Sequence, residues 1–329
     1  MSVGRVAGVM AAGKAATPGL LAGTQAQRRS GAQRRGTVMP YQPKYSRGLF
    51  PVRLDDGTWQ ICDASDVPSD DVDMEHPSIA RVYDYYLGGS HNFAVDRQIA
   101  RQTIELWPEL PLVMHANRAF LRRSVRYLVR QGITQFLDIG SGIPTEGNVH
   151  EIAQAAAPKT RVVYVDIDPV AVAHSRAILT GNKHADVVQA DLRDVAAILD
   201  DPRTRRLIDP TQPIGVLMVA ILHFVPDDAG PANIVAQYRN MMAPGSYLVV
   251  SHASHGGQPE LFEPATELYR RTTAPLTRRS RLEIEALLEG FDLVPPGVVF
   301  LPLWHPDSPT DVDDHPERFN GYAVVGRRE

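Results

Sequence analysis

The pattern of apolar and polar positions changes after Gly132 into an alternation of two kinds of segment. Short apolar runs typical of strands occur at Gln135–Asp138, Arg161–Val165, Asp186–Ala190, Gly215–Leu222, Tyr247–Ser251, Val298–Leu303 and Tyr322–Val325. Helical stretches lie between the first five runs and before the last two, at Gly147–Ala157, Ala171–Leu179, Val195–Leu199, Gly230–Met242, Glu260–Thr272 and Arg281–Leu288. This order predicts an α/β fold with a mostly parallel sheet covered on both faces. The last two runs have no helix between them, which favours an antiparallel edge pair.

The segment before this alternation reads as helical from Pro77 onward. Apolar side chains recur there at helical spacing until Gly88 and Gly89 interrupt the pattern. Two further helices are expected at about Phe93–Leu106 and Leu112–Gln131. Residues 77–329 are therefore expected to form the folded domain, with residues 77–132 as its helical part.

The first 76 residues have a different composition. Residues 1–47 are rich in Gly, Ala, Ser and Arg without steady periodicity, and are expected to form a disordered basic tail. The alternatives are a start site assigned too far upstream, a transit peptide, or an arm that touches nucleic acid. The tail has almost no aromatic side chains for stacking on bases, which disfavours the last of these. Residues 48–76 are expected to form a lead-in or linker.

Charge and cysteine content restrict the classes of partner. The 329 residues carry a net charge of −4, but residues 1–54 hold nine Lys or Arg and no acid. Residues 55–329 therefore hold 25 basic against 38 acidic side chains, a formal charge of −13, which disfavours nucleic acid and anionic membranes as partners. Cys62 is the single cysteine, so an internal disulfide is excluded and a cytoplasmic location is expected. No apolar run reaches the about 18 residues of a membrane span.

A glycine-rich turn follows the first strand of the alternation. Asp138 ends that strand, and Gly140, Ser141 and Gly142 come directly after it. Such turns let the backbone approach a nucleotide-like ligand. The dinucleotide pattern Gly-x-Gly-x-x-Gly is broken, because Thr145 takes the place of its last glycine. An acid before the turn also disfavours a pyrophosphate and favours a ligand with an ammonium or sulfonium group, so the sequence predicts S-adenosylmethionine.

Acidic residues also follow the next two strands. Asp166 ends the second, beside Ile167, and suits hydrogen bonding to ribose hydroxyls. Asp168 is instead expected to cap the following helix. After the third strand, Asp191 is a candidate partner for an adenine amine, and the backbone N–H of Leu192 for a ring nitrogen. Alternatively, Asp191 caps a helix.

Histidines follow the fourth and fifth strands. His223 comes after the fourth and faces the reacting end of a cofactor in such a fold, so it is the first candidate for the general base that a hydroxyl acceptor would need. His252 and His255 are second candidates. A hydrogen-bonded structural role for His223 is the alternative.

The chain resembles the class I S-adenosylmethionine-dependent methyltransferases, and more closely one bacterial S-adenosyl methyltransferase family once known only as a domain of unknown function. The resemblance lies in PSIARVYDYYLGGSHNFAVDRQIA (77–100), VVYVDIDPVAVAHSR (162–176), VQADLRDV (188–195), VLMVAILHFVPD (216–227) and the final segments FDLVPPGVVFLPLWHPD and NGYAVVGRR. It implies a Rossmann-like, seven-stranded sheet, with the helices of 77–131 as a cap over the cofactor. It also implies a methionine-end cradle at Asp138, Gly140 and Gly142, with ribose on Asp166 and adenine on Asp191.

The first of these motifs concentrates polar residues on both sides of the Gly-Gly interruption. Our hypothesis is that Arg81 or Arg97 pairs with the carboxylate of the cofactor, that Asp84 or Asn92 accepts from its ammonium group, and that Tyr85 contacts it nearby. The alternative is an Asp–Arg salt bridge that fixes the cap.

The sequence thus predicts a methyltransferase with S-adenosylmethionine as methyl donor and a small molecule as acceptor, without a metal. A non-catalytic sensor of S-adenosylmethionine or its product is an alternative, because binding and catalysis use the same residues. A nicotinamide-dependent oxidoreductase is a further alternative that Thr145 disfavours. The acceptor and the oligomeric state are left open.

Overall fold

A computed structural model describes residues 49–53, 59–63, 73, 75–144, 147–256, 259–270, 272, 274–312 and 314–329. The predicted basic tail lies outside the described residues, as does most of the predicted lead-in. Within the lead-in, strands β1 (Leu49–Arg53) and β2 (Trp59–Asp63) pair with each other antiparallel.

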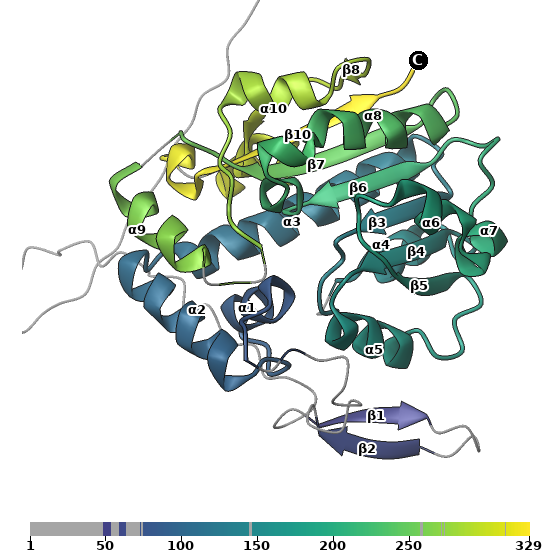
Figure 1. The fold of residues 1–329 in the computed structure, drawn as a ribbon. Coiled ribbons are helices and arrows are strands. Elements are labelled where there is room, and N and C mark those ends of the chain that lie inside the picture. The colour runs from purple at the N-terminus through teal and green to yellow at the C-terminus, as the bar shows by residue number, and fades with distance from the viewer. Residues whose placement is uncertain are drawn as a thin grey trace, which may run out of the picture. The chain divides into compact units, whose positions relative to one another are not determined.

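A mixed sheet forms the centre of the described fold (Figure 1). Its strands are β3 (Gln135–Ile139), β4 (Arg161–Asp166), β5 (Ala185–Gln189), β6 (Gly215–Val219), β7 (Tyr247–Ala253), β8 (Asp292–Leu293), β9 (Val299–Phe300) and β10 (Gly321–Arg327). The order is β5-β4-β3-β6-β7-β10-β8, with β9 also on β10. Strands β3 to β7 are parallel, and β10 runs antiparallel to β7. The chain reverses its direction of travel across the sheet between β3 and β6, and ligands of such sheets bind at this switch point.

The connecting segments are largely helical. The helices are α1 (Ile79–Tyr86), α2 (Ala94–Leu106), α3 (Leu110–Arg130), α4 (Val149–Ala156), α5 (Pro169–Ile178), α6 (Val195–Asp200), α7 (Pro202–Leu207), α8 (Pro231–Met241), α9 (Pro259–Tyr269) and α10 (Arg281–Leu287). The expected α/β fold is confirmed, with eight strands in the sheet rather than seven.

Alternating side chains of each strand supply two separate cores. Phe136 and Val162 pack with α3 and α4 on one face, whereas Leu137 and Val163 pack with α6, α8 and α10 on the other. Successive side chains of a strand point to opposite faces. Continuous apolar runs therefore fit a sheet that is covered on both sides, as the sequence predicts.

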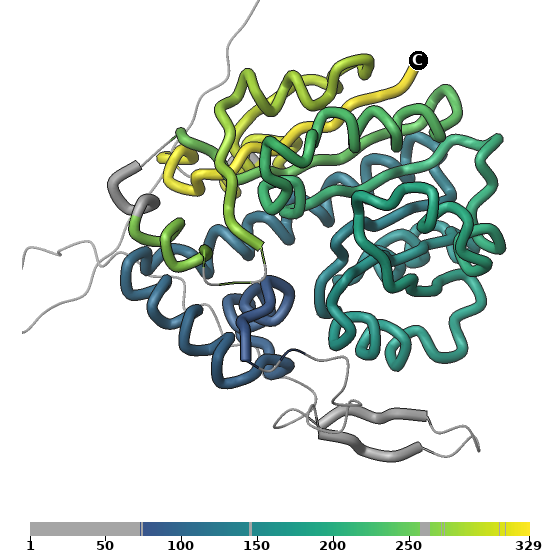
Figure 2. The backbone as a smooth tube through the Cα atoms, viewed as in Figure 1, coloured from purple at the N-terminus to yellow at the C-terminus, as the bar shows by residue number. Residues whose placement is uncertain are grey.

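The N-terminal helices lie near the carboxyl ends of the parallel strands. Helix α1 packs on α2 and α3, and α2 packs on α9, so segments far apart in the sequence lie side by side (Figure 2). The long helix α3 also contacts β6 and β7. The side chains of α1 and α3 can therefore contribute to a site at the switch point.

Two predicted strands are shorter than expected. The run Gly215–Leu222 leaves the strand after Val219, because Ala220 has a left-handed backbone with φ of +59°. A 3₁₀ turn then covers Leu222–Phe224. The run Val298–Leu303 pairs over two residues only before another 3₁₀ turn. Both turns are buried, so their apolar composition does not distinguish them from strands.

Candidate functional site

A cavity of about 380 Å³ opens beside the carboxyl ends of β3, β4, β5 and β6. Eight predicted cofactor residues are among those that line it: Asp138, Gly140, Ser141, Gly142, Asp166, Ile167, Asp191 and Leu192. The parallel strands β3, β4 and β5 bring these residues together from three separate stretches of sequence, as the sequence reasoning requires.

The glycine-rich turn is held tightly against the sheet. The backbone N–H groups of Gly140 and Ser141 both donate to the carbonyl oxygen of Val165, at 2.8 and 3.1 Å. Gly140 has φ of +69°, and a Cβ at this position would lie 2.4 Å from the Ile221 side chain. Glycine is thus required here by both conformation and space.

Asp166 is fixed in place by backbone donors. Its carboxylate accepts from the N–H of Gly142 at 2.7 Å and from the N–H of Asp168 at 2.9 Å. Burial raises the pKa of Asp166 to about 6, although these two hydrogen bonds lower it. Each oxygen keeps a further lone pair, so the oriented carboxylate suits a pair of vicinal hydroxyls.

Asp138 is the most perturbed acid in the lining. It is 6 % exposed, and burial raises its pKa to about 7, with the nearby Arg118 lowering it and Asp166 raising it. A buried carboxyl of this kind gains from a positive group placed beside it. The cavity wall at the end of β3 is therefore suited to a cationic ligand.

Asp191 and Leu192 form the edge of the cavity at β5. The Asp191 carboxylate is paired with the exposed Arg193 guanidinium and accepts from the Arg193 N–H at 2.9 Å, and this hydrogen bonding lowers its pKa. The alternative role as a helix cap falls instead to Asp194, which accepts from the N–H of Ala197 at the start of α6.

Two further features of the lining fit a nucleoside-like group. The Ser141 hydroxyl is buried without a hydrogen-bond partner among the described residues. Ile167 is 63 % exposed, unusually high for a large apolar side chain in a cavity wall. A polar atom in need of a partner and an uncovered apolar surface are both satisfied when a bound molecule occupies the space.

The sequence reasoning did not identify Arg118. Its guanidinium donates to the carbonyl oxygen of Gly147 at 3.0 Å, and Arg118 lines the cavity. It shares the inner face of α3 with apolar residues at helical spacing, such as Leu110, Met114 and Leu121. The sequence feature that could have pointed to Arg118 is its position within an apolar stripe of a helix. A charged side chain on such a stripe requires a partner inside the fold.

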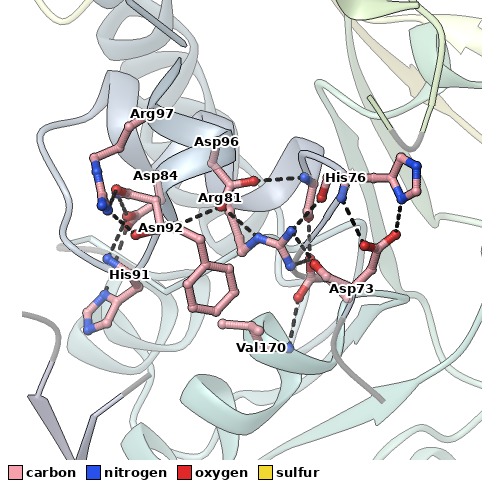
Figure 3. Close-up of polar contacts among 12 residues, drawn as sticks. Asp73, His76, Arg81, Asp84, His91, Asn92, Asp96, Arg97 and Val170 are labelled. Atoms are coloured by element: carbon pink, nitrogen blue, oxygen red, sulfur yellow. Dashed lines mark hydrogen bonds and ion pairs between the residues drawn. The ribbon is translucent and has the colours of Figure 1, made fainter. Parts of the chain in front are cut away.

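Arg81 does not line the cavity. Its Nε donates to Asp96 at 2.8 Å, its Nη2 donates to the carbonyl oxygens of Asp73 and His76 at 2.9 Å, and Nη1 lies 3.6 Å from Asp168 (Figure 3). These contacts occupy the guanidinium. The alternative interpretation, a salt bridge that fixes the cap, describes the observed geometry.

The other predicted residues of this motif also lie outside the cavity lining. The Asp84 carboxylate accepts from the N–H of His91 at 2.9 Å and from Nδ2 of Asn92 at 2.7 Å (Figure 3), and burial raises its pKa to about 6. The Tyr85 hydroxyl accepts from Arg101. Asp84, Tyr85 and Asn92 therefore support the cap, and the predicted contacts with a cofactor have no counterpart in the lining of the cavity.

One residue joins this network to the cavity. Ser78 lines the cavity, and its hydroxyl donates to Asp168. Asp168 also accepts from the N–H groups of Val170 and Ala171, which confirms its predicted role as the cap of α5. Through Ser78, which directly precedes α1, the cap helices are thus attached to Asp168, two positions after the predicted ribose ligand Asp166.

A second, apolar cavity of about 90 Å³ adjoins the first. The two share the lining residues Ile79, Tyr83, Asn117, Ala220 and Phe224. We refer to these five residues as the border. The larger space is lined by four carboxylates, whereas the smaller is lined mainly by apolar side chains.

A chain of hydrogen bonds runs through the border, and each group in it accepts from the preceding group and donates to the next. The N–H of Ala220 donates to Oγ of Ser251 at 2.9 Å, and Ser251 donates to Oδ1 of Asn117 at 2.6 Å. Nδ2 of Asn117 donates to the Tyr83 hydroxyl at 2.9 Å, which donates in turn to the carbonyl oxygen of Met114. This chain connects β6, β7, α3 and α1.

The three candidate histidines have different environments. His223 lines the smaller cavity, and its Nδ1 accepts from the N–H of Ala253 at 3.2 Å. Burial, with His252 and Arg279, places the pKa of His223 well below its usual range. His255 is exposed and lines neither cavity.

His252 is fixed by a buried arginine that the sequence reasoning missed. Arg279 donates to Nε2 of His252 at 2.8 Å, to the carbonyl oxygens of Leu222 and Val225, and to Asp227. It thereby holds the turn after β6 against β7. Arg279 follows Thr277 and Arg278 in a run of polar residues, where nothing in the sequence distinguishes it from its neighbours.

Two kinds of feature are absent from the described residues. No group of three or more His, Cys, Asp or Glu side chains there is arranged to hold a metal ion. No helix in that part of the chain is long and apolar enough to cross a membrane.

Comparisons with known proteins show the family of this chain. Residues 65–329 match the family model described as S-adenosyl methyltransferase. A crystal structure of a candidate methyltransferase from Thermobifida fusca YX is similar to this chain, with 40% identity and a TM-score of 0.75, over 80% of this chain and 99% of that one. A DUF574 family protein from Streptomyces avermitilis MA-4680 has 38% identity and a TM-score of 0.75, over 78% and 99%. A search of curated proteins found no match.

The fold and these similarities place the chain among the Rossmann-like methyltransferases, with S-adenosylmethionine as cofactor. The chain belongs to the S-adenosyl methyltransferase family. The resemblance recognised in the sequence is thereby confirmed.

Proposed function

We propose that this protein transfers the methyl group of S-adenosylmethionine to a small molecule. The observation that carries this proposal is the pair of adjoining cavities, one acidic and one apolar, that meet at the border. A methyl donor and an acceptor must lie side by side for transfer. A sensor needs only the first space, so the second space favours an enzyme over the sensor alternative.

The residues of the larger cavity divide into three parts in this proposal. Asp166 binds the ribose hydroxyls, while Asp191, Leu192 and the exposed face of Ile167 surround the adenine. The turn at Gly140–Gly142 and Asp138 hold the methionine end. These roles follow the order of the strands, because β5, β4 and β3 lie in sequence across the sheet.

Arg118 completes the methionine end by pairing with its carboxylate. Arg118 and Arg193 are the cations among the described lining residues, and Arg193 is already paired with Asp191 at the opposite edge. Arg118 lies close enough to Asp138 to lower the pKa of that carboxyl. An arginine beside an acid suits the zwitterionic end of an amino acid.

The remaining parts of the proposal concern the acceptor and its location. The acidic composition of residues 55–329 disfavours nucleic acid, and the small apolar cavity suits a compact molecule. The single cysteine is consistent with a cytoplasmic site of action.

Calorimetry with an Arg118→Met variant tests the proposed cofactor site. We expect the variant to bind S-adenosylmethionine about tenfold more weakly than the unaltered protein does, from the loss of one charge-assisted pair. Binding of 5′-methylthioadenosine, which has no amino acid portion, should be unchanged. Arg97→Met serves as the matched control, because Arg97 donates to Asn92 outside the cavity lining. Equal losses for both ligands would contradict the assigned role of Arg118.

Formation of S-adenosylhomocysteine tests transfer itself. Incubation of the unaltered protein with S-adenosylmethionine and a panel of small neutral molecules should yield S-adenosylhomocysteine and a methylated product. Tight binding of S-adenosylmethionine and S-adenosylhomocysteine without turnover on any molecule of the panel would favour the sensor alternative. Binding of NAD in preference to S-adenosylmethionine would contradict the proposal.

A further inference from the structure

The chemistry of the smaller cavity limits the molecules that can accept the methyl group. This restriction rests on the proposed function, in which the smaller cavity is the acceptor site. The described linings of the two cavities meet at the border, so an acceptor atom must reach that position. The class of acceptor then depends on the groups that surround it.

The described side chains that line the smaller cavity carry no formal charge at neutral pH. Among the described residues that line it there is no Asp, Glu, Lys or Arg. Its titratable groups are Tyr83, Tyr269, His223 and His252. Burial raises the pKa of both tyrosines and lowers that of both histidines, that of His252 to about 4. A charged acceptor would lose its hydration here without gaining a counter-ion.

The histidines of this cavity are not arranged to take up a proton. Because Nδ1 of His223 accepts from the N–H of Ala253, the proton of the neutral ring lies on Nε2. Nδ1 of His252 donates to the carbonyl oxygen of Ala253 at 2.7 Å, and its Nε2 accepts from Arg279. His223 therefore presents an N–H donor, and both nitrogens of His252 are occupied.

The hydroxyl groups are occupied as well. Those of Tyr83 and Ser251 belong to the hydrogen-bond chain through the border, and that of Tyr269 donates to Tyr86 at 3.1 Å. An alcohol or phenol acceptor has to lose a proton during methyl transfer. The described side chains around this cavity offer no group that receives it.

We infer that the acceptor is a compact, uncharged, mostly apolar molecule whose methyl-accepting atom is a weakly basic nitrogen, such as that of an aromatic amine. The nitrogen lone pair forms the new N–C bond while the C–S bond breaks, and the electron pair of that bond remains on sulfur. The positive charge passes from sulfur to nitrogen, and the N–H proton is lost to water after the product leaves. His223 acts in this reaction as an N–H donor to the ring face of the acceptor, which leaves the nitrogen lone pair free to receive the methyl group. It thus takes the place of the general base that the sequence suggested for a hydroxyl acceptor.

The size of the cavity further restricts the acceptor. At about 90 Å³ it is smaller than the roughly 150 Å³ apolar cavity that accommodates benzene. A single small ring fits only if it extends to the border, which is where the accepting atom has to lie.

Ligand-observed NMR on the protein saturated with S-adenosylhomocysteine tests the inference with four single-ring probes: aniline, phenol, benzoate and benzylammonium. We expect aniline and phenol to bind with similar affinity, and the two charged probes at least tenfold more weakly. With S-adenosylmethionine, aniline should gain a methyl group by mass spectrometry and phenol should not. Tighter binding of a charged probe, or methylation of phenol but not aniline, would overturn the inference.

Val113→Phe provides a variant that fills only the smaller cavity. Val113 is buried on α3 and lines that cavity but not the larger one. Aniline binding should fall at least tenfold, whereas S-adenosylhomocysteine binding should stay within twofold and thus show that the variant is folded. Undiminished aniline binding would contradict the assignment of the smaller cavity as the acceptor site.

If the unaltered protein fails to bind S-adenosylhomocysteine, the proposed function itself is contradicted. If it binds that nucleoside but no probe, only the acceptor assignment is.

Two substitutions of His223 distinguish a donor from a base. His223→Gln keeps an N–H donor and should retain turnover within about tenfold, with most of its effect on KM. His223→Leu removes the donor and should raise KM for aniline by at least tenfold more than His223→Gln does. If His223 is a general base, both variants lose it, and kcat should fall strongly in both. A histidine inflection in the pH profile of the unaltered enzyme should then be missing from the profiles of the variants. That result would overturn the donor role.

Discussion

The carboxylate of Asp166 accepts a hydrogen bond from the backbone N–H of Gly142 at 2.7 Å. This contact joins the end of β4 to the glycine-rich turn that follows β3. One acid therefore shapes the turn while its remaining lone pairs face the cavity. The proposed ribose site and the proposed methionine site are consequently parts of one rigid unit.

Replacement of Asp166 should weaken cofactor binding more than it weakens the fold. We expect Asp166→Ala to reduce affinity for S-adenosylmethionine by about 10- to 100-fold, from the loss of hydrogen bonds to a charged acceptor. Calorimetry measures the affinity, and thermal unfolding checks the fold. Asp194→Ala is the control, because Asp194 caps α6 outside the cavity lining and should cost only about 1 kcal/mol of stability. Equal affinity losses in both variants would contradict the ribose role.

Binding of the cofactor should depend on pH through Asp138. Because burial raises the pKa of Asp138 to about 7, its carboxylate fraction falls as the pH falls through neutrality. A positively charged ligand favours the ionised form, so affinity should drop by about tenfold from pH 8 to pH 6. Calorimetry over this range measures the effect. Asp138→Asn should bind more weakly at pH 8 and show a flatter profile, and an equal slope in the variant would assign the effect to another group.

The buried pair of Arg81 and Asp96 should dominate the stability of the cap. Both side chains are at most 2 % exposed, so Arg81→Met leaves the buried Asp96 carboxylate without its counter-ion, although the backbone N–H groups of Ser78 and Phe93 still donate to it. This loss should cost about 3 to 5 kcal/mol. Urea unfolding measures this cost. Arg205→Met, which breaks an exposed pair with Asp200, should cost less than about 1 kcal/mol. An Arg81→Met, Asp96→Asn double variant that loses the sum of the two single effects would show that the pair is not coupled.

The two glycines of the turn should respond differently to alanine. Both have positive φ, which costs a non-glycine residue about 1 to 2 kcal/mol. A Cβ on Gly140 also meets Ile221, whereas a Cβ on Gly142 meets nothing within 4 Å. Gly140→Ala should therefore destabilise the protein by about 1 to 3 kcal/mol more than Gly142→Ala does. Equal losses in urea unfolding would show that Ile221 moves aside freely.

The strand-end residues were predictable because their signal is local. An apolar run followed by an acid, as at Val165 and Asp166, fixes both the strand and the position at its carboxyl end. Parallel strands then bring those ends to one edge of the sheet. The positions of Asp138, Asp166 and Asp191 in the cavity lining follow from this rule without any knowledge of contacts.

The cap could not be predicted in the same way, because its contacts are distant in sequence. Arg81 bonds to Asp96 and approaches Asp168, and the periodicity of α1 does not indicate which of its faces meets the cofactor cavity. Arg118 lies on the apolar face of α3, where spacing alone suggests core packing. Which arginine reaches the cavity therefore depends on how α1 and α3 pack, which sequence spacing does not encode.

The one-directional hydrogen-bond chain from Ala220 to Tyr83 has a consequence for kinetics. Each hydroxyl or amide in the chain donates a hydrogen bond to the next group and keeps its proton, so the chain offers no site that takes up a proton from the acceptor when the methyl group moves. The rate must then derive from alignment of the reactants, which contributes at most about 7 to 11 kcal/mol. The turnover rate in heavy water should accordingly match the rate in ordinary water. A solvent isotope effect of about two or more would reveal a proton transfer that the hydrogen-bond chain through the border does not provide.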